Sequence, residues 1–245
     1  MMSASEFVTR SREGAAALTA ALTRPDARVE RLVFAAAHDA AVTAEVIGSP
    51  KAVTAASVLR PAAFAALAVT AARDMLRVGR RGGEAVALSV LMAAGEGSVA
   101  ARTASYALLT PALTAQAAQP SRWPGLLPSG ASAGVSAVVL AAGWRRHELT
   151  PTAIAAEAAA GLARAWALTA ANNDALRAGA VPAKGISHGV NMIAAAEAGE
   201  ACLRAAGGSA WVTRVASACL FSARALGVVL VTDGLTRGEA SEQEV

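Results

Sequence analysis

Apolar positions recur along most of the chain with the three- and four-residue spacing of an α-helix, and Pro or Gly residues mark where helical segments end. The alternating pattern of a β-strand occurs only at residues 228–231. The predicted segments are about Ser11–Thr23, Asp26–Ile47, Ala52–Val78, Glu84–Ala94, Ser98–Gln119, Ala133–Trp144, Thr150–Ala171, a segment from Ser187 to Gly207-Gly208, and Ser209–Val231. We therefore expect an all-α fold, a single Ala-rich helical bundle domain of about nine helices over residues 1–238, with residues 239–245 as a frayed C-terminal tail.

Three breaks interrupt the helical pattern. Residues 79–83 are glycine-rich and predict a hinge. Residues 119–134, rich in Pro, Ser and Gly, predict a long loop over the surface or over a pocket, and residues 172–184 predict a second irregular stretch. Long loops in a compact domain are commonly functional, so these two stretches are the expected surroundings of a binding site.

Alanine dominates the composition. Hydrophobic residues make up 55% of the chain and aromatic residues only 4%. Ala has the highest helix propensity, and its small side chain lets helix axes approach closely, so a tight bundle is expected. A chain of 245 residues buries a sizeable core without a disulfide or a metal. We expect Cys202 and Cys219 to be small core residues in a reducing cytosol.

Charge and hydropathy limit the classes of partner. The 22 Lys and Arg residues exceed the 18 Asp and Glu residues, but the basic residues are spread as pairs and do not form a cluster, which argues against nucleic-acid binding. Residues 1–14 lack the apolar core of a signal peptide, and residues 123–144, although uncharged, contain too much Pro, Gly and Ser for a membrane helix. We therefore expect a soluble cytoplasmic protein without nucleic-acid or membrane partners.

The sequence contains no glycine-rich nucleotide loop, no Gly-x-Ser-x-Gly elbow and no metal-binding spacing, so no cofactor and no metal is expected. Three histidines remain as candidates for chemistry. His147, beside two arginines, is expected to be a solvated helix cap. His38, next to Asp39 in an apolar run, is either a general base or a hydrogen-bonded core or interface histidine.

His188 is the strongest of the three candidates. It lies at the predicted start of a helix, where unpaired backbone donors and the positive dipole end suit a carboxylate. Lys184 adds a positive charge nearby, and Gly185 and Gly189 let a ligand approach the backbone. The alternative is an ordinary capped helix start with an exposed histidine.

Three groups of residues resemble the N-terminal helical domain of the MmgE/PrpD family, which includes 2-methylcitrate dehydratase and cis-aconitate decarboxylase. They are Ser89–Ser98 with Ala100–Leu113; Pro128-Ser129 with Ala137–Ala142 and Ala155–Leu168; and Gly185-Ile186-Ser187-His188 with Ala194–Ala196 and Ala205–Gly208. The resemblance extends over about residues 28–238. It implies an MmgE/PrpD-like helical domain that acts on a small organic acid.

The chain departs from the pattern of that family at several positions. The acidic pair of the family would fall at residues 114–117, where the sequence is Thr-Ala-Gln-Ala, and the histidine that precedes Pro-Ser would fall at Leu127. Only the downstream histidine carries over, onto His188. Family members are about twice as long and have a second α+β domain that supplies further residues. Residues 233–237 resemble the family's Lys-bearing segment only faintly. These departures argue against a conventional dehydratase.

The resemblance and the residues together predict a cofactor-independent lyase, isomerase or cyclase that acts on a small carboxylate- or carbonyl-bearing metabolite in specialised biosynthesis. His188 would act as general acid and base, and Lys184 or Asn191 would hold the carboxylate or carbonyl. The pocket is expected between the loop 119–134 and the start of the His188 helix, with Trp123 and Leu127 covering an apolar ligand.

A protein of a different class is the alternative: a catalytically silent helical subunit that dimerises or supports a partner. The Ala-rich faces at residues 153–165 and 194–206 have little bulk to keep a monomer isolated, and related helical domains commonly pair. We expect a homodimer under either hypothesis.

Overall fold

The computed structural model describes residues 4–78, 80–95, 98–116, 150–206 and 209–237, together with residues 130, 133, 134, 137 and 141. All regular elements of this part of the chain are helical, which confirms the predicted all-α domain. They are α1 (Ala4–Leu22), the 3-10 helix η1 (Pro25–Ala27), α2 (Arg28–Ile47), α3 (Pro50–Val78), α4 (Arg80–Ala94), α5 (Val99–Gln116), α7 (Pro151–Ala171), α8 (Asp174–Ala178), α9 (Val181–Ala206) and α10 (Ala210–Arg237).

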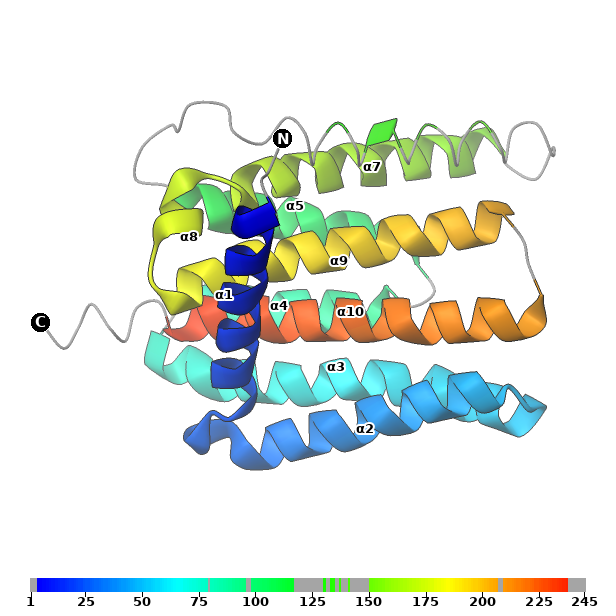
Figure 1. Cartoon of the computed structure of the whole chain (residues 1–245), viewed down its shortest axis with the longest axis horizontal. Coiled ribbons are helices and arrows are strands. Elements are labelled where there is room, and N and C mark those ends of the chain that lie inside the picture. Colours follow the sequence, from blue (N-terminus) through cyan, green and yellow to red (C-terminus); the bar gives the residue numbers. More distant parts are fainter. Residues whose placement is uncertain are drawn as a thin grey trace, which may run out of the picture.

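Helix α10 is the centre of the bundle. The long helices lie side by side with α10 between α9 and the α2–α3 hairpin, and α1 crosses them at a steep angle (Figure 1). Every residue from Gly227 to Thr236 is buried. A helix that is buried on all sides must be apolar or paired around its circumference. The polar side chains of this segment are Thr232 and Thr236, which bond to backbone carbonyl oxygens, and Asp233, which pairs with Arg237 through one of its two oxygens.

Glycine brings α9 and α10 into backbone contact. A Cβ atom added to Gly189 would lie 2.5 Å from the carbonyl oxygen of Gly227, and one added to Gly227 would lie 2.7 Å from the carbonyl oxygen of Gly189. No side chain fits at either position unless the helices separate. The close approach of the two helices therefore depends on this pair.

Local end signals were good predictors of several helix boundaries. Thr150 caps α7, and its side chain accepts a 3.2 Å hydrogen bond from the backbone nitrogen of Ala153. Helix α2 ends at Gly48, which adopts the left-handed conformation with φ of 65°.

Three expectations were wrong. The glycine-rich segment does not form a hinge at residues 80–83: α4 begins at Arg80, and a Cβ atom added to Gly82 would lie 2.3 Å from the Met75 Cα, so Gly82 serves the tight corner between α3 and α4. Residues 172–184 contain α8 and the start of α9. Cys202 and Cys219 are exposed, because the other faces of α9 and α10 form the core.

Two of the described helices, α3 over Pro50–Leu76 and α10, are long and apolar enough to cross a bilayer. The core helix of a soluble protein has the same length and composition, and 56% of the α10 window is buried inside the bundle. Only 28% of the α3 window is buried, so the apolar exposure of α3 requires another explanation.

Candidate functional site

His188 lies two turns inside α9, because that helix begins at Val181 and not at Ser187. Pro182 explains the earlier start, since a proline in the first turn of a helix removes only a donor that has no partner there. The predicted helix N-terminus at His188 is therefore wrong. Backbone donors at that position belong to the helix and do not face a ligand.

The His188 side chain is half-buried against α1. A Cβ atom added to Gly14 would lie 3.3 Å from the His188 ring, and Lys184 Nζ forms a 2.7 Å ion pair with Glu13 Oε1 beside it. Burial, and after it the charge of Arg10, lowers the pKa of His188. This direction favours the neutral imidazole that a general base requires.

The other predicted binding residues contact neighbouring helices. Gly185 faces Ala17 and Leu230, and Gly189 faces the backbone of α10 as described above, so protein atoms fill the space that we expected a ligand to use. The Asn191 amide donates a 2.7 Å hydrogen bond to the Ser187 carbonyl oxygen. Asn191 and Asn172 also exchange side-chain hydrogen bonds of 3.1 and 3.3 Å.

Trp123 and Leu127 lie outside the described residues, as do His147 and most of the loop 119–134. The predicted pocket between that loop and the His188 helix therefore stays a prediction.

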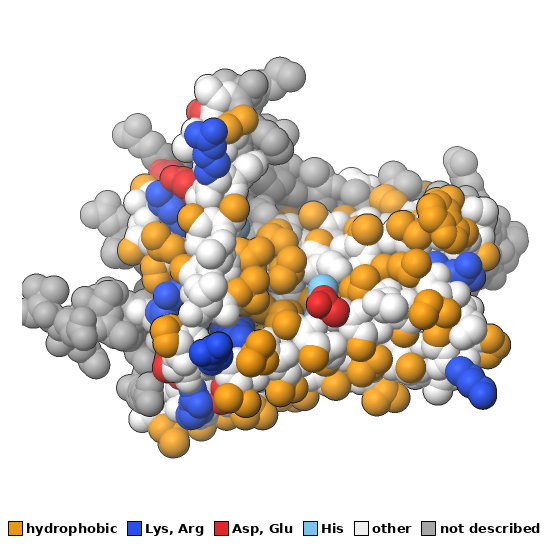
Figure 2. All heavy atoms as spheres, turned by 60° about the horizontal axis from the view of Figure 1, so that its bottom comes forward, with side chains coloured by type: hydrophobic (Ala, Val, Ile, Leu, Met, Phe, Trp, Pro, Cys, Tyr) orange, Lys and Arg blue, Asp and Glu red, His pale blue; other side chains and the backbone are white. Residues whose placement is uncertain are grey.

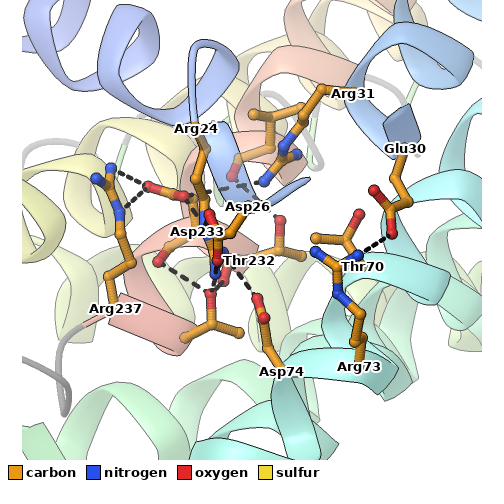
Figure 3. A network of polar contacts seen from close by, with 12 residues as sticks. Arg24, Asp26, Glu30, Arg31, Thr70, Arg73, Asp74, Thr232, Asp233 and Arg237 are labelled. Atoms are coloured by element: carbon orange, nitrogen blue, oxygen red, sulfur yellow. Dashed lines mark hydrogen bonds and ion pairs between the residues drawn. The ribbon is translucent and has the colours of Figure 1, made fainter. Parts of the chain in front are cut away.

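Four helical elements meet in a buried ionic network at one end of the bundle (Figure 3). Arg24 forms a bidentate ion pair with Asp26, with hydrogen bonds of 2.8 and 2.7 Å. Its Nη1 donates further hydrogen bonds to Asp74 at 2.7 Å and to Thr236 at 3.2 Å. Burial by itself would lower the pKa of Arg24, but the hydrogen bonds to Asp26 and Asp74 outweigh burial and raise it. Asp233 is paired with Arg237.

The same network leaves several buried polar atoms without a hydrogen bond among the described residues. They are Arg31 Nε and Nη1, Asp74 Oδ1 and Asp233 Oδ1. Arg31 Nη2 approaches Asp233 Oδ1 only to 3.9 Å, and burial lowers the pKa of Arg31. The gap lined by Arg31, Asp74 and Thr236 has no room for a water molecule, which favours a network that joins the helices over a ligand site at this position.

A second buried polar cluster joins α5, α7, α9 and α10. Tyr106 and Glu197 lie in its interior, and Glu197 Oε2 is 3.7 Å from Arg164 Nη1. Burial raises the pKa of Glu197, and it also raises the pKa of Tyr106 well above its ordinary value. Arg224 pairs with Glu200 at 3.4 Å at the edge of this cluster.

His38 has partners on both ring nitrogens. His38 Nδ1 lies 2.9 Å from Asp39 Oδ1, and His38 Nε2 lies 3.1 Å from the hydroxyl oxygen of Ser222 on α10. The ring stacks between Phe34 at 5.8 Å and Phe221 at 5.6 Å. This arrangement is compatible with both interpretations of His38 that the sequence allowed. The histidine is hydrogen-bonded and mostly buried, and it also has the partners of a general base.

Helices α2 and α3 each present an exposed stripe with the alternating four- and three-residue spacing of a helix that packs against another helix. We call the two stripes together the outer face. Hydrophobic side chains gather over this side of the molecule (Figure 2). The stripe of α2 is Val29, Val33, Ala36, Ala40, Thr43 and Ile47, and that of α3 is Val58, Ala62, Ala65, Val69, Ala72 and Leu76.

No family model, curated protein or solved structure matches the chain. The resemblance to the MmgE/PrpD helical domain therefore stays a prediction, and the function must be argued from the geometry alone.

Proposed function

We propose that the chain functions as a homodimer whose subunits pack against each other through the outer face of α2 and α3. The observation that carries the proposal is the exposed heptad-like stripe on each of two adjacent helices. Val58, Val69 and Leu76 on α3 are 66%, 59% and 85% exposed. Large apolar side chains that line one face of a helix are ordinarily buried against another helix.

The dimensions of the outer face suit a protein interface. Each stripe extends over 19 residues, from Val29 to Ile47 and from Val58 to Leu76, which corresponds to about 28 Å of helix. Two adjacent helices, each about 10 Å across, give a strip of about 560 Å² in projection, which is of the same order as the roughly 800 Å² of accessible surface that one partner buries in a standard interface. A second copy of the chain offers the same surface by symmetry.

A protein partner explains this face better than lipid does. Asp39, which lies beside the stripe at the middle of α2, is 80% exposed, and a membrane-embedded hairpin would carry this carboxylate close to the bilayer centre. Small residues such as Ala36, Ala40, Ala62 and Ala65 allow a second helix to approach closely. The Ala-rich face predicted at residues 194–206 is different, because Ala194, Ala196 and Ala201 are buried within the chain itself.

The test is to replace Val69 by Glu and to measure the dimer dissociation constant by sedimentation velocity. An unpaired carboxylate in the interface should weaken the dimer at least about tenfold. The matched control is Leu162→Glu on α7, an apolar position within the other Ala-rich face that is 72% exposed, against 59% for Val69. If Leu162→Glu separates the subunits and Val69→Glu does not, the interface is on α7 and the proposal is wrong.

The lyase or isomerase hypothesis stays a second proposal, supported by one observation. The half-buried His188 imidazole has a lowered pKa and lies beside the Lys184–Glu13 pair, so it is neutral at pH 7 and able to accept a proton. A dimer of the proposed kind leaves this region of α9 and α1 uncovered, since neither helix belongs to the outer face.

A further inference from the structure

Ser222, His38 and Asp39 are connected in the order of a nucleophile, its base and an orienting carboxylate. The Asp39 carboxylate only accepts hydrogen bonds, so His38 Nδ1 carries the proton at that contact. His38 Nε2 is then the unprotonated nitrogen, and it accepts the hydrogen bond of the Ser222 hydroxyl. This tautomer is the one that a histidine needs to remove a proton from serine.

Aromatic packing holds the imidazole in this orientation. The His38 side chain is only 14% exposed, and its ring lies at 29° to Phe34 and 20° to Phe221, which stack on it. The Arg60 guanidinium lies 5.0 Å from the centre of the same Phe221 ring, which brings a positive charge to the surroundings of the site. A base that is fixed by its neighbours loses little entropy when it reacts.

We propose that Ser222 is a nucleophile that takes the acyl group of a short, uncharged ester. The Ser222 oxygen bonds to the ester carbonyl carbon as its proton moves to His38 Nε2. The bond from that carbon to the alcohol oxygen then breaks, and the alcohol leaves with the proton from His38. Water next attacks the acyl-serine through the same base, which releases the acid and restores the Ser222 hydroxyl. The balance is one ester and one water to one acid and one alcohol.

The substrate class follows from the surroundings of the site. Phe34 and Phe221 flank the base and favour an apolar acyl chain, and the Asp39 carboxylate bonded to His38 disfavours an anionic one. This activity goes beyond the proposed dimer and does not depend on it, because neither Ser222 nor Asp39 belongs to the stripes of the outer face.

The experiment treats the full chain with an alkyl fluorophosphonate, which forms a covalent bond with activated serines, and maps the adduct by peptide mass spectrometry. Hydrolysis of p-nitrophenyl butyrate is measured in parallel. The variants are Ser222→Ala, His38→Gln and Asp39→Asn. Ser217→Ala is the matched control, since Ser217 lies on the same helix but bonds Arg60 and not a histidine.

We expect an adduct on Ser222 in the wild type and in Ser217→Ala, and a fall in labelling and hydrolysis of at least about a hundredfold in His38→Gln. Wild-type protein without an adduct on Ser222 would overturn the proposal, and this result requires no variant to fold. Labelling of Ser222 at an equal rate in wild type and a folded His38→Gln, checked by circular dichroism, would overturn it as well.

Discussion

Glu197 and Asp26 show how neighbouring groups set the pKa of a carboxyl group in this bundle. The hydrogen bonds from Arg24 lower the pKa of Asp26. Burial raises the pKa of Glu197, and the nearby positive charges of Arg102 and Arg224 only partly offset that effect. The charged form of Glu197 is therefore disfavoured by folding, whereas that of Asp26 is favoured.

This difference predicts the pH dependence of a Glu197→Gln variant. Because the folded pKa of Glu197 is raised, the folded state binds more protons than the unfolded state between the two pKa values, and the contribution of Glu197 to stability falls as pH rises through that interval. Glu197→Gln removes the contribution. The free energy of unfolding of wild type minus that of the variant should decrease from pH 4 to pH 7, as measured by urea denaturation. A difference that increases over this range would contradict the assignment.

His188 gives a second prediction at this scale. Replacing His188 by Ala removes a half-buried ring that packs on Gly14, so the loss of stability should be on the order of 1 kcal/mol. If His188 is the general base of a lyase or isomerase, turnover of the substrate should fall at least about a hundredfold while the fold stays intact. Unfolding of the variant in thermal denaturation would assign His188 a structural role.

At the scale of elements, the backbone contact between α9 and α10 makes opposite predictions for two glycines. Gly189→Ala places a Cβ atom 2.5 Å from the Gly227 carbonyl oxygen, so it should destabilise the fold by about 1–3 kcal/mol. At Gly83, inside α4, a Cβ atom would meet only Met75 Sδ at 3.7 Å, and Gly83→Ala should stabilise the helix by up to about 1 kcal/mol. Chemical denaturation of both variants checks the signs. A stable Gly189→Ala protein would show that the helices are not closely packed.

The elements also show which signals in a sequence are local. Thr150, Pro151 and Gly48 mark helix ends through hydrogen bonds and backbone angles within a few residues, and those ends were predicted correctly. The residues around Gly82 predict a hinge, but glycine is required at this position because the backbone contacts Met75 across the corner between two helices. The sequence alone does not distinguish a glycine that is needed for packing from a glycine that is needed for a turn.

For the whole molecule, the helical class followed from composition and spacing, but the candidate sites did not. Ser222 is 184 positions from His38, and nothing near either residue indicates that they meet. His38 beside Asp39 was the available signal, and it made a general base one of two interpretations of His38 without indicating the Ser222 hydroxyl. The stripes of the outer face are visible in the sequence only after the structure shows which side of α2 and α3 is buried.

The mass of the native protein in solution tests the central claim, that the outer face of α2 and α3 pairs two subunits, most directly. Light scattering on wild-type protein at micromolar concentration, without detergent, should give about twice the chain mass of 24.4 kDa. A mass near 24.4 kDa would contradict the claim, and flotation of that monomer with phospholipid vesicles would show that lipid covers the face instead.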